Sequence, residues 1–234
     1  MTELTTSKTE RDPKTAKNRK LCQEYCQTYQ SKFRDIEYLS SNQLIELTTQ
    51  RKDDIVLVDV RTNPEREVSV IEGAITKEEF SQRAHEIPQN AQVVLYCTIG
   101  YRSGLEARRL KIKYPEFQTR IKSLDGIVSY THALGETLNT RKYQNEKSEK
   151  EPPSAAPRKI CHPQTGQSTK KVHTFGGVWG LVDDEYFEST HFSIPELLLR
   201  LMQVSGSVVS CVWLRSKHFC SSLRSAEHPK AKHY

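Results

Sequence analysis

The chain has 234 residues, carries a net charge of +6 at pH 7 and is 35% hydrophobic, with a mean hydropathy of −0.68. These values argue against one uniformly packed globule of this length and predict a compact core with substantial polar flanks. The basic and acidic residues are interleaved rather than gathered in one segment, so the composition does not indicate a nucleic-acid partner.

The first residues, MTELTTSKTERDPKTAKNRK, contain no apolar run long enough for a secretory signal. We therefore expect a cytoplasmic, reducing location in which the six cysteines are free thiols. The spacing of the cysteines shows no metal-finger pattern, so we predict no metal and no cofactor. Residues 197–214 approach the length of a membrane span, but Arg200, Gln203 and a Ser/Gly-rich middle count against a span.

Taken in chain order, a polar segment comes first, and within it residues 18–33 have the spacing of a helix that carries Leu21, Tyr25 and Tyr29. Apolar, β-branched runs then alternate with helical patterns. We predict strands at 35–40, 54–60, near 74–75, at 91–97 and within 120–130. We predict helices at 41–50, 76–87 and 103–114, the first of them preceded by a capping box of Ser40 and Gln43. This alternation is typical of an α/β fold with a parallel sheet.

The composition divides the chain into four parts. They are a polar, basic amino-terminal segment (1–30), the α/β domain (31–138), a flexible, partly disordered linker (139–170) and a small C-terminal extension (171–234). In the extension, Ser193 and Glu196 are spaced as a capping box, with Pro195 in the first turn of a helix.

The stretch VVLYCTIGYRSGLEARRL, residues 93–110, carries the chemistry. Cys97 ends a buried parallel strand, at the sheet edge where α/β folds place their sites. Backbone N–H groups of the next loop, the start of the following helix and the charge of Arg102 all favour a thiolate, which is the nucleophilic form. The alternative is a small buried residue at a strand end, since free cysteine is often buried. Gly100, Arg102 and the loop length favour the catalytic interpretation.

Three stretches resemble, in order and spacing, a single-domain rhodanese, which is a sulfurtransferase. They are IVLVDVR at 55–61, GAI at 73–75 and VVLYCTIGYRSGLEA at 93–107. VSVIEGAI resembles one rhodanese-like subgroup rather than the commoner form with a Gly-His pair before its Ile, so the His of that form has no counterpart here. DGIVSYTHALGE and, after the predicted linker, HPQTGQSTKKVHTFGGVW resemble the C-terminal extension of that subgroup. The resemblance implies a rhodanese-like parallel β-sheet flanked by helices.

The resemblance also implies a ping-pong reaction in which Cys97 takes a sulfane sulfur from a donor such as thiosulfate and becomes a persulfide. Cyanide or a thiol then removes that sulfur. Arg102 would hold the anionic part of the donor. The N–H groups that would cradle the persulfide belong to a substrate-binding loop of Thr98, Ile99, Gly100, Tyr101 and Ser103.

The expected partners follow from this reaction: a small sulfur donor, a thiol or cyanide acceptor, or a protein that donates or accepts sulfur. Neither nucleic acid nor a membrane is expected. Asp59 and Arg61 match the family's DVR stretch. For these two residues we favour a supporting role, in which they tie the strand end to neighbouring loops, over direct contact with the substrate.

Two other functions remain alternatives. Relatives of this fold that cleave phosphate esters separate the cysteine and the arginine by five residues, whereas Cys97 and Arg102 are separated by four, Thr98 to Tyr101. The shorter loop suits a sulfur atom better than a phosphate. The other alternative is a binding or regulatory module that carries the fold without turnover. Tyr101 is bulky and would gate the site or select a donor.

The remaining cysteines and histidines give weaker signals. Cys22 and Cys26 share one helix face, where metal binding and resolution of a persulfide are possible roles, but a half-buried amphipathic face is favoured. Cys161, His162 and His173 are not accompanied by a second pair at ligand spacing, so a metal site is not favoured there.

Overall fold

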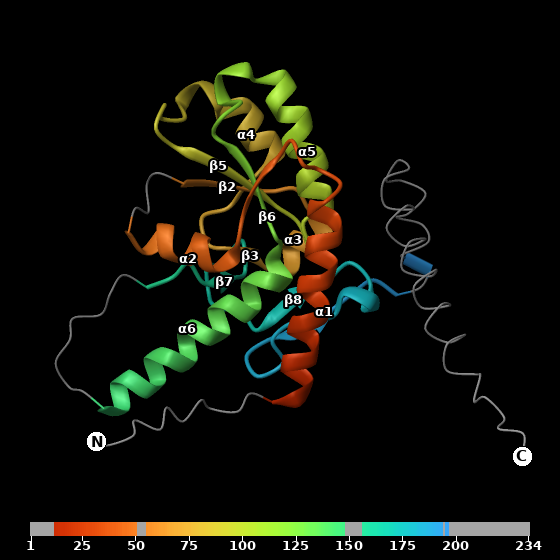
Figure 1. Cartoon of the computed structure of the whole chain (residues 1–234), viewed down its shortest axis with the longest axis vertical. Helices are drawn as coiled ribbons and strands as arrows, with labels where there is room; N and C mark the ends of the chain where they lie inside the picture. The colour runs from red at the N-terminus through yellow and green to blue at the C-terminus, as the bar shows by residue number, and fades with distance from the viewer. Residues whose placement is uncertain (1–11, 51–54, 148–155, 194, 197–234) are drawn as a thin grey trace, which may run out of the picture. The chain divides into compact units, whose positions relative to one another are not determined.

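The computed structural model describes residues 12–50, 55–147, 156–193 and 195–196 (Figure 1). The chain divides into two compact units, Met1–His191 and Phe192–Tyr234. In the second unit, the backbone N–H and the hydroxyl of Ser193 donate to the Glu196 carboxylate over 2.9 and 2.7 Å, as expected of the predicted capping box. All elements described below belong to the first unit.

A five-stranded sheet forms the centre of the first unit, with the strand order β1-β6-β5-β2-β4. Its strands are β1 (Glu37–Leu39), β2 (Ile55–Asp59), β4 (Ile75–Thr76), β5 (Gln92–Tyr96) and β6 (Ile121–Leu124). All neighbouring strands are parallel, which confirms the predicted sheet. Because β5 is the middle strand, the residue that follows it leaves the sheet at its centre.

Helices cover this sheet. The α-helices are α1 (Pro13–Gln30), α2 (Ser41–Gln50), α3 (Asn63–Val68), α4 (Lys77–Arg83), α5 (Tyr101–Lys113) and α6 (Ile127–Lys147). Short 3₁₀ helices are η2 (Ala84–Glu86), η3 (Pro115–Phe117) and η4 (Gly177–Trp179). α1 packs against α5 and α6, and Figure 1 shows it in red beside the green α6. None of the helices in the described ranges is long and apolar enough to cross a membrane.

Local signals set several helix ends. The Ser40 N–H donates to Gln43 Oε1 over 2.9 Å and the Gln43 N–H donates to Ser40 Oγ over 3.2 Å, which is the predicted capping box of α2. Thr76 and Glu79 make the same exchange at the start of α4. α5 ends at Lys113, just ahead of the proline that follows Tyr114.

α6 differs most from the sequence prediction, which placed only a turn after Gly126 and a linker from residue 139. The structure places α6 through Lys147 and β7 (Ile160–Cys161) inside the predicted linker, 139–170, and so corrects the prediction for these residues. The fully buried first turn, with Ile127 and Val128, starts a helix that the polar residues after it can extend, because each added residue gains one hydrogen bond. Residues 148–155 of the predicted linker lie outside the described part.

Two small strand pairs form in the chain that follows residue 155, and the first of them joins it to the α/β domain. β7 pairs antiparallel with β3 (Val70–Ile71), and β8 (Lys171–His173) pairs parallel with β9 (Glu188–Thr190). β8 also contacts α3. Trp179 and Phe187 are buried, and the Tyr186 hydroxyl donates to the side chain of Asn139 on α6. Residues 171–191 of the extension are therefore part of the same compact unit as the sheet.

α1 buries a stripe of its surface against the domain. The stripe consists of Thr15, Asn18, Cys22, Cys26 and Tyr29, so the predicted helix exists but faces inward with its cysteines rather than with Leu21 and Tyr25. The helix begins after Asp12, whose side chain accepts from the Thr15 N–H over 3.1 Å. Residues 13–30 of the predicted polar, basic amino-terminal segment thus form a layer of the domain.

Candidate active site

Cys97 directly follows β5 and lies on the face of the sheet that packs against α5. Its side chain joins Val93 and Leu95 in one cluster with Ala107 and Leu110 of α5, because alternate residues of a strand share a face. The residue is 1% exposed. The predicted position at the carboxyl edge of a central strand is therefore confirmed, with the sulfur well below the surface.

Two hydrogen-bond donors lie next to the Cys97 sulfur. The Gly100 N–H lies 3.2 Å from Cys97 Sγ, and the Ser103 hydroxyl lies 3.6 Å from it. Ser103 Oγ in turn accepts from the Ser123 hydroxyl over 3.0 Å, so its own proton is available to the sulfur or to the Gly100 carbonyl. Gly100 takes a left-handed φ of 91° as N-cap of α5. Both donors, and the positive end of α5, favour negative charge on the sulfur.

Backbone hydrogen bonds from the start of α6 hold the Cys97 loop in place. The first two N–H groups of α6 have no partner within their own helix. The Ile127 N–H donates to the Cys97 carbonyl over 2.9 Å and the Val128 N–H to the Thr98 carbonyl over 3.2 Å. Gly126, with a φ of 114°, permits this approach, since a Cβ there would lie 2.4 Å from Thr98 O. The start of α6 thus sets the position of the nucleophile.

Arg102 does not stand alone at the loop. α5 begins at Tyr101, two residues before the predicted start at Ser103. Arg102 therefore lies in the first turn of the helix. Its guanidinium makes a bidentate ion pair with the Glu65 carboxylate, with N–O distances of 2.6 and 2.7 Å. It also donates to Thr98 Oγ1 over 3.0 Å. The side chain of Glu65, on α3, is fully buried and that of Arg102 is 16% exposed.

The ion pair decides the charge at this end of the site. Burial alone would raise the pKa of Glu65, but the charge and hydrogen bonds of Arg102 outweigh burial and lower that pKa to about 2. Glu65 is therefore ionised at neutral pH and offsets the charge of Arg102. The predicted loop cation is present, with an anion already bound to it.

The C-terminal extension covers this ion pair. The guanidinium of Arg102 lies over the Phe175 ring, 4.9 Å from its centroid. Phe175 has a φ of 63°, which is unusual for a residue other than glycine, and its N–H donates to His173 Nδ1 over 3.0 Å. Burial is the main cause that lowers the pKa of His173 to about 4, with Glu65 opposing and Arg102 reinforcing the shift, so this histidine is neutral at pH 7. No group of metal-binding side chains occurs within the described ranges.

Tyr101 faces α1 and the segment that follows it. Its ring makes edge contacts with Tyr29 and Phe33, each with a centroid distance of 5.4 Å, and Lys32 Nζ lies 5.5 Å from its centroid. The ring is thereby held by the amino-terminal helix.

Asp59 and Arg61 form a buried network at the end of β2. Arg61 donates to the Asp59 carboxylate from Nε and Nη2, with a shortest distance of 2.7 Å, and to the Ser69 carbonyl over 2.6 Å. The Tyr96 hydroxyl donates to Asp59 over 2.7 Å and accepts from the Ile71 N–H. Both charged side chains are fully buried, and their contacts tie the strand end to the chain around β3.

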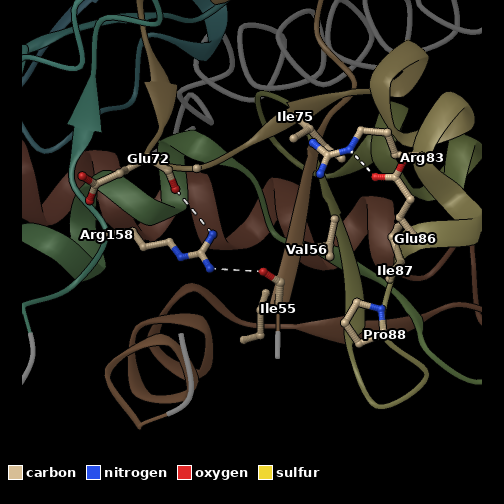
Figure 2. Close-up of a pocket in the computed structure, with 10 residues that line it drawn as sticks. Ile55, Val56, Glu72, Ile75, Arg83, Glu86, Ile87, Pro88 and Arg158 are labelled. Atoms are coloured by element: carbon tan, nitrogen blue, oxygen red, sulfur yellow. Dashed lines mark hydrogen bonds and ion pairs between the residues drawn. The ribbon is translucent and has the colours of Figure 1, made fainter. Parts of the chain in front are cut away.

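A cavity of about 510 Å³ lies at the amino end of β2 rather than beside Cys97 (Figure 2). Arg158 spans it and donates to the Ile55 carbonyl over 3.1 Å, and Arg83 pairs with Glu86 over 3.0 Å. The apolar side chains of Ile55, Ile75 and Ile87 line it. Because β2 and β5 are parallel neighbours, this end of the sheet is opposite the end that carries Cys97.

Several residues around the loop were not identified from the sequence. Glu65 was read as part of a polar turn, although Thr62 and Glu65 have the spacing of a capping box, and the Thr62 N–H does donate to Glu65 Oε2 over 3.0 Å. That spacing was the only local signal for this residue. Phe175 and Cys26 come from segments far away in the sequence. No local sequence pattern predicts their contacts with Arg102 and with the Ile99 carbonyl.

Comparison with known families gives one match, the rhodanese-like domain, over residues 42–130. These residues include α2, β2, β5, the Cys97 loop and α5. The comparison with curated proteins gives no match.

Solved structures resemble parts of the chain. A thiosulfate sulfurtransferase from Pseudomonas aeruginosa is 16% identical over 67% of this chain and 23% of its own, with a TM-score of 0.38. A NAD-dependent persulfide reductase from A. fulgidus is 29% identical over 43% of this chain and 17% of its own, with a TM-score of 0.30. A Rhodopseudomonas palustris protein of unknown function, described as a possible tyrosine phosphatase, is 20% identical over 48% and 89%, with a TM-score of 0.37. The chain thus spans less than a quarter of the first two proteins, and none of these likenesses assigns an activity to it.

Proposed function

Residues 42–130 form a rhodanese-like domain, and from that premise we propose that the chain transfers sulfane sulfur through a persulfide on Cys97. The observation that carries the proposal is the environment of the sulfur. Cys97 Sγ accepts from the Gly100 N–H at 3.2 Å, is 3.6 Å from the Ser103 hydroxyl and lies at the amino end of α5. These groups would stabilise negative charge on the terminal sulfur of a persulfide.

The reaction has two halves. In the first, Cys97 Sγ bonds to the outer sulfur of the donor, the bond from that sulfur to the rest of the donor breaks, and the leaving group keeps the electron pair. With thiosulfate the leaving group is sulfite. In the second, cyanide or a thiolate attacks the outer sulfur of the persulfide, and Cys97 recovers its electron pair as a thiolate.

The Glu65–Arg102 pair bears on the choice of donor. A dianion such as thiosulfate gains little from a cation whose charge is already offset by a carboxylate at 2.6 Å. A low-molecular-weight or protein persulfide carries less charge and needs less from Arg102. We therefore propose persulfides and thiosulfate as the donor class, with persulfides used more efficiently.

Mass spectrometry of the full chain tests the proposal. Exposure to thiosulfate or to an organic persulfide is expected to add the mass of one sulfur to the peptide that contains Cys97, and cyanide is expected to remove it. Cys97→Ser should show no such gain, and Cys161→Ser, which alters another buried cysteine, should behave as wild type. An unmodified Cys97 in a protein that hydrolyses an aryl phosphate would instead favour phosphatase chemistry.

One observation favours a second candidate, a binding module without turnover. Cys97 is 1% exposed, and Arg102 contacts Glu65 and Phe175. A donor must therefore displace part of the cover before it meets the sulfur. If neither sulfur uptake nor phosphate hydrolysis occurs, this second function accounts for the enclosed loop.

A further inference from the structure

Cys22 and Cys26 of α1 form a pair of buried thiols beside the Cys97 loop. Their Sγ atoms are 4.0 Å apart, and both are free thiols. Both sulfurs are close to the Ser129 hydroxyl of α6, at 3.3 and 3.4 Å. Their separation is short enough for a disulfide to form after a movement of about 2 Å, since bonded sulfurs are about 2.05 Å apart.

Cys26 also touches the loop that holds the nucleophile. Its Sγ lies 3.9 Å from the Ile99 carbonyl oxygen and 3.2 Å from the Asp125 carbonyl oxygen. The Ile99 carbonyl and the Gly100 N–H belong to one planar peptide unit. The N–H at the other end of that unit is the donor 3.2 Å from Cys97 Sγ. One peptide unit therefore contacts Cys26 with its oxygen and Cys97 with its hydrogen.

A small cavity leads to this pair. Its volume is about 130 Å³, which holds about four waters at about 30 Å³ each. Polar side chains line it, among them Ser41, Asp125, Ser129 and His132, and Cys22 lines it as well. A cavity of this size admits a hydroperoxide or a similarly small oxidant but not a tripeptide thiol. Cys22 is thus the thiol that such a molecule meets.

We propose that Cys22 and Cys26 are a reversible oxidation site, and that closing a disulfide between them lowers the reactivity of Cys97. Cys22 attacks the hydroperoxide, which leaves as an alcohol or water, and becomes a sulfenic acid. Cys26 then attacks that sulfur, a water leaves, and a disulfide forms. In sum, two thiols are oxidised and one hydroperoxide is reduced.

The division of roles within the pair agrees with its electrostatics. The hydrogen bond with Cys22 and then burial raise the pKa of Cys26 well above its usual value, so Cys26 keeps its proton and donates it toward the Asp125 carbonyl oxygen. Cys26 is therefore the poorer first nucleophile, which leaves Cys22, the cysteine that lines the cavity, to attack the oxidant.

The disulfide affects the loop because it removes the Cys26 thiol from its carbonyl partners. Residues four apart on a helix have Cβ atoms about 5–6 Å apart, whereas a disulfide needs about 3.5–4.5 Å, so this turn of α1 must shift as the bond forms. The Ile99 peptide then loses its contact with the Cys26 S–H. Gly100, with its left-handed φ, lets the peptide rotate, and its N–H turns away from Cys97.

The test uses the full chain with Cys211 and Cys220 replaced by serine, so that only cysteines of the described ranges remain. The protein is treated with one equivalent of hydrogen peroxide, and the rate of Cys97 alkylation by iodoacetamide is followed by peptide mass spectrometry. We expect a Cys22–Cys26 disulfide peptide and a fall of about tenfold in the alkylation rate, the effect of one lost hydrogen bond to a thiolate. Dithiothreitol should restore the rate.

Two variants, Cys22→Ser and Cys26→Ser, separate this effect from direct oxidation of Cys97. Any loss of alkylation that persists in them reports peroxide acting on Cys97 itself. The proposal is overturned if Cys22 and Cys26 both remain free thiols after peroxide treatment. It is also overturned if Cys22→Ser and Cys26→Ser lose Cys97 reactivity as fully as the protein that keeps both cysteines. Sulfur uptake is measured separately on the reduced protein, so a failure there would count against the sulfur-transfer function and leave the oxidation site standing.

Discussion

The two sides of the Cys97 loop are held by different chemistry. On one side, Thr98 and Arg102 meet the Glu65 carboxylate, a fully ionised contact beneath the Phe175 ring. On the other side, the Ile99 carbonyl meets the Cys26 thiol, a neutral and weak contact beneath α1. The ionised side resists change, because separating a buried ion pair is costly. The thiol side is the one that a mild chemical change can alter.

The difference also separates stability from reactivity. Glu65 caps α3 and binds Arg102 at the same time, so its loss should affect the whole fold. The Cys26 contact involves one side chain and two backbone carbonyls, so its loss should affect the loop alone. The predictions below test this contrast, beginning with the nucleophile that both sides position.

Replacing the nucleophile should have the largest effect. For Cys97→Ser we expect sulfur transfer to fall by about 10³-fold or more, because a serine hydroxyl forms no persulfide. The fold should be retained, since serine is close to cysteine in size. Initial rates with an organic persulfide, compared with those of Cys161→Ser, measure the effect. Activity within tenfold of wild type would place the reaction at another residue.

The ion pair should dominate the stability of the loop region. For Glu65→Gln we expect the free energy of unfolding to fall by about 3 kcal/mol, because Arg102 loses the partner of a largely buried charge. Glu78→Gln, an exposed position on α4, is the matched control and should change stability little. Urea unfolding at pH 7 measures both variants. If Glu65→Gln were as stable as wild type, the attraction between Glu65 and Arg102 would only offset the cost of burying their charges.

This contribution should depend on pH in the acid range. The folded pKa of Glu65 is about 2, below the value of about 4.3 in an unfolded chain. Its stabilising effect is therefore complete above about pH 5 and is lost as the pH falls toward 2. The gap in stability between wild type and Glu65→Gln should be constant from pH 7 to 5 and shrink below it.

The sequence predicted the parts of this site that are local. Cys97, Gly100 and Arg102 lie within one strand, loop and helix, and their pattern depends on the period of the strand and the start of the helix. Glu65 and Phe175 come from segments far away in the chain, so only the folded sheet and extension bring them to Arg102. The composition of a polar turn such as that around Glu65 gives no sign of the partner it will meet.

The elements show the same limit. β2 and β5 were predicted closely because continuous apolar runs mark a strand buried on both faces. α6 was missed because its first turns, around Ile127 and Tyr130, are buried on nearly all sides, and its second half is polar. Neither half carries the one-sided pattern of an amphipathic helix. Packing against α1 and α2, and the hydrogen bond from Tyr186 of the extension to Asn139, stabilise the helix instead.

On the thiol side, Asp125 should show a pH dependence opposite to that of Glu65. Burial raises the pKa of Asp125 to about 6, despite hydrogen bonds from Ser41 that lower it. A raised carboxyl pKa means that the stability present below about pH 4 is lost as the pH rises through 6. Asp125→Asn should therefore be more stable than wild type at pH 8, by about 2 kcal/mol, with the gap closing toward pH 4.

Asp35→Asn gives the contrast in sign, because its hydrogen bonds with Arg108 lower the pKa of Asp35 to about 2. For that variant, the difference from wild type should diminish on acidification below about pH 4 rather than on a rise in pH. Thermal melts between pH 2 and 8 measure both variants. A gap that does not change with pH in Asp125→Asn would mean that this carboxyl is not perturbed by its burial beside Cys26.

The smallest expected effect concerns the cover over the ion pair. Phe175 contributes its ring face to Arg102, and a cation–π contact of this kind is worth about 1 kcal/mol. Phe175→Leu keeps an apolar side chain but removes the ring, so the cover should open more often and Cys97 alkylation should rise by about threefold. Val178→Leu, at a position exposed on η4, is the control in the same segment. Because the ring touches Arg102 and not the Cys26 side, the Cys22–Cys26 disulfide should form in Phe175→Leu as readily as in wild type. The opposite result, altered disulfide formation with unchanged Cys97 alkylation, would contradict the assignment of Phe175 to the ion-pair side of the loop.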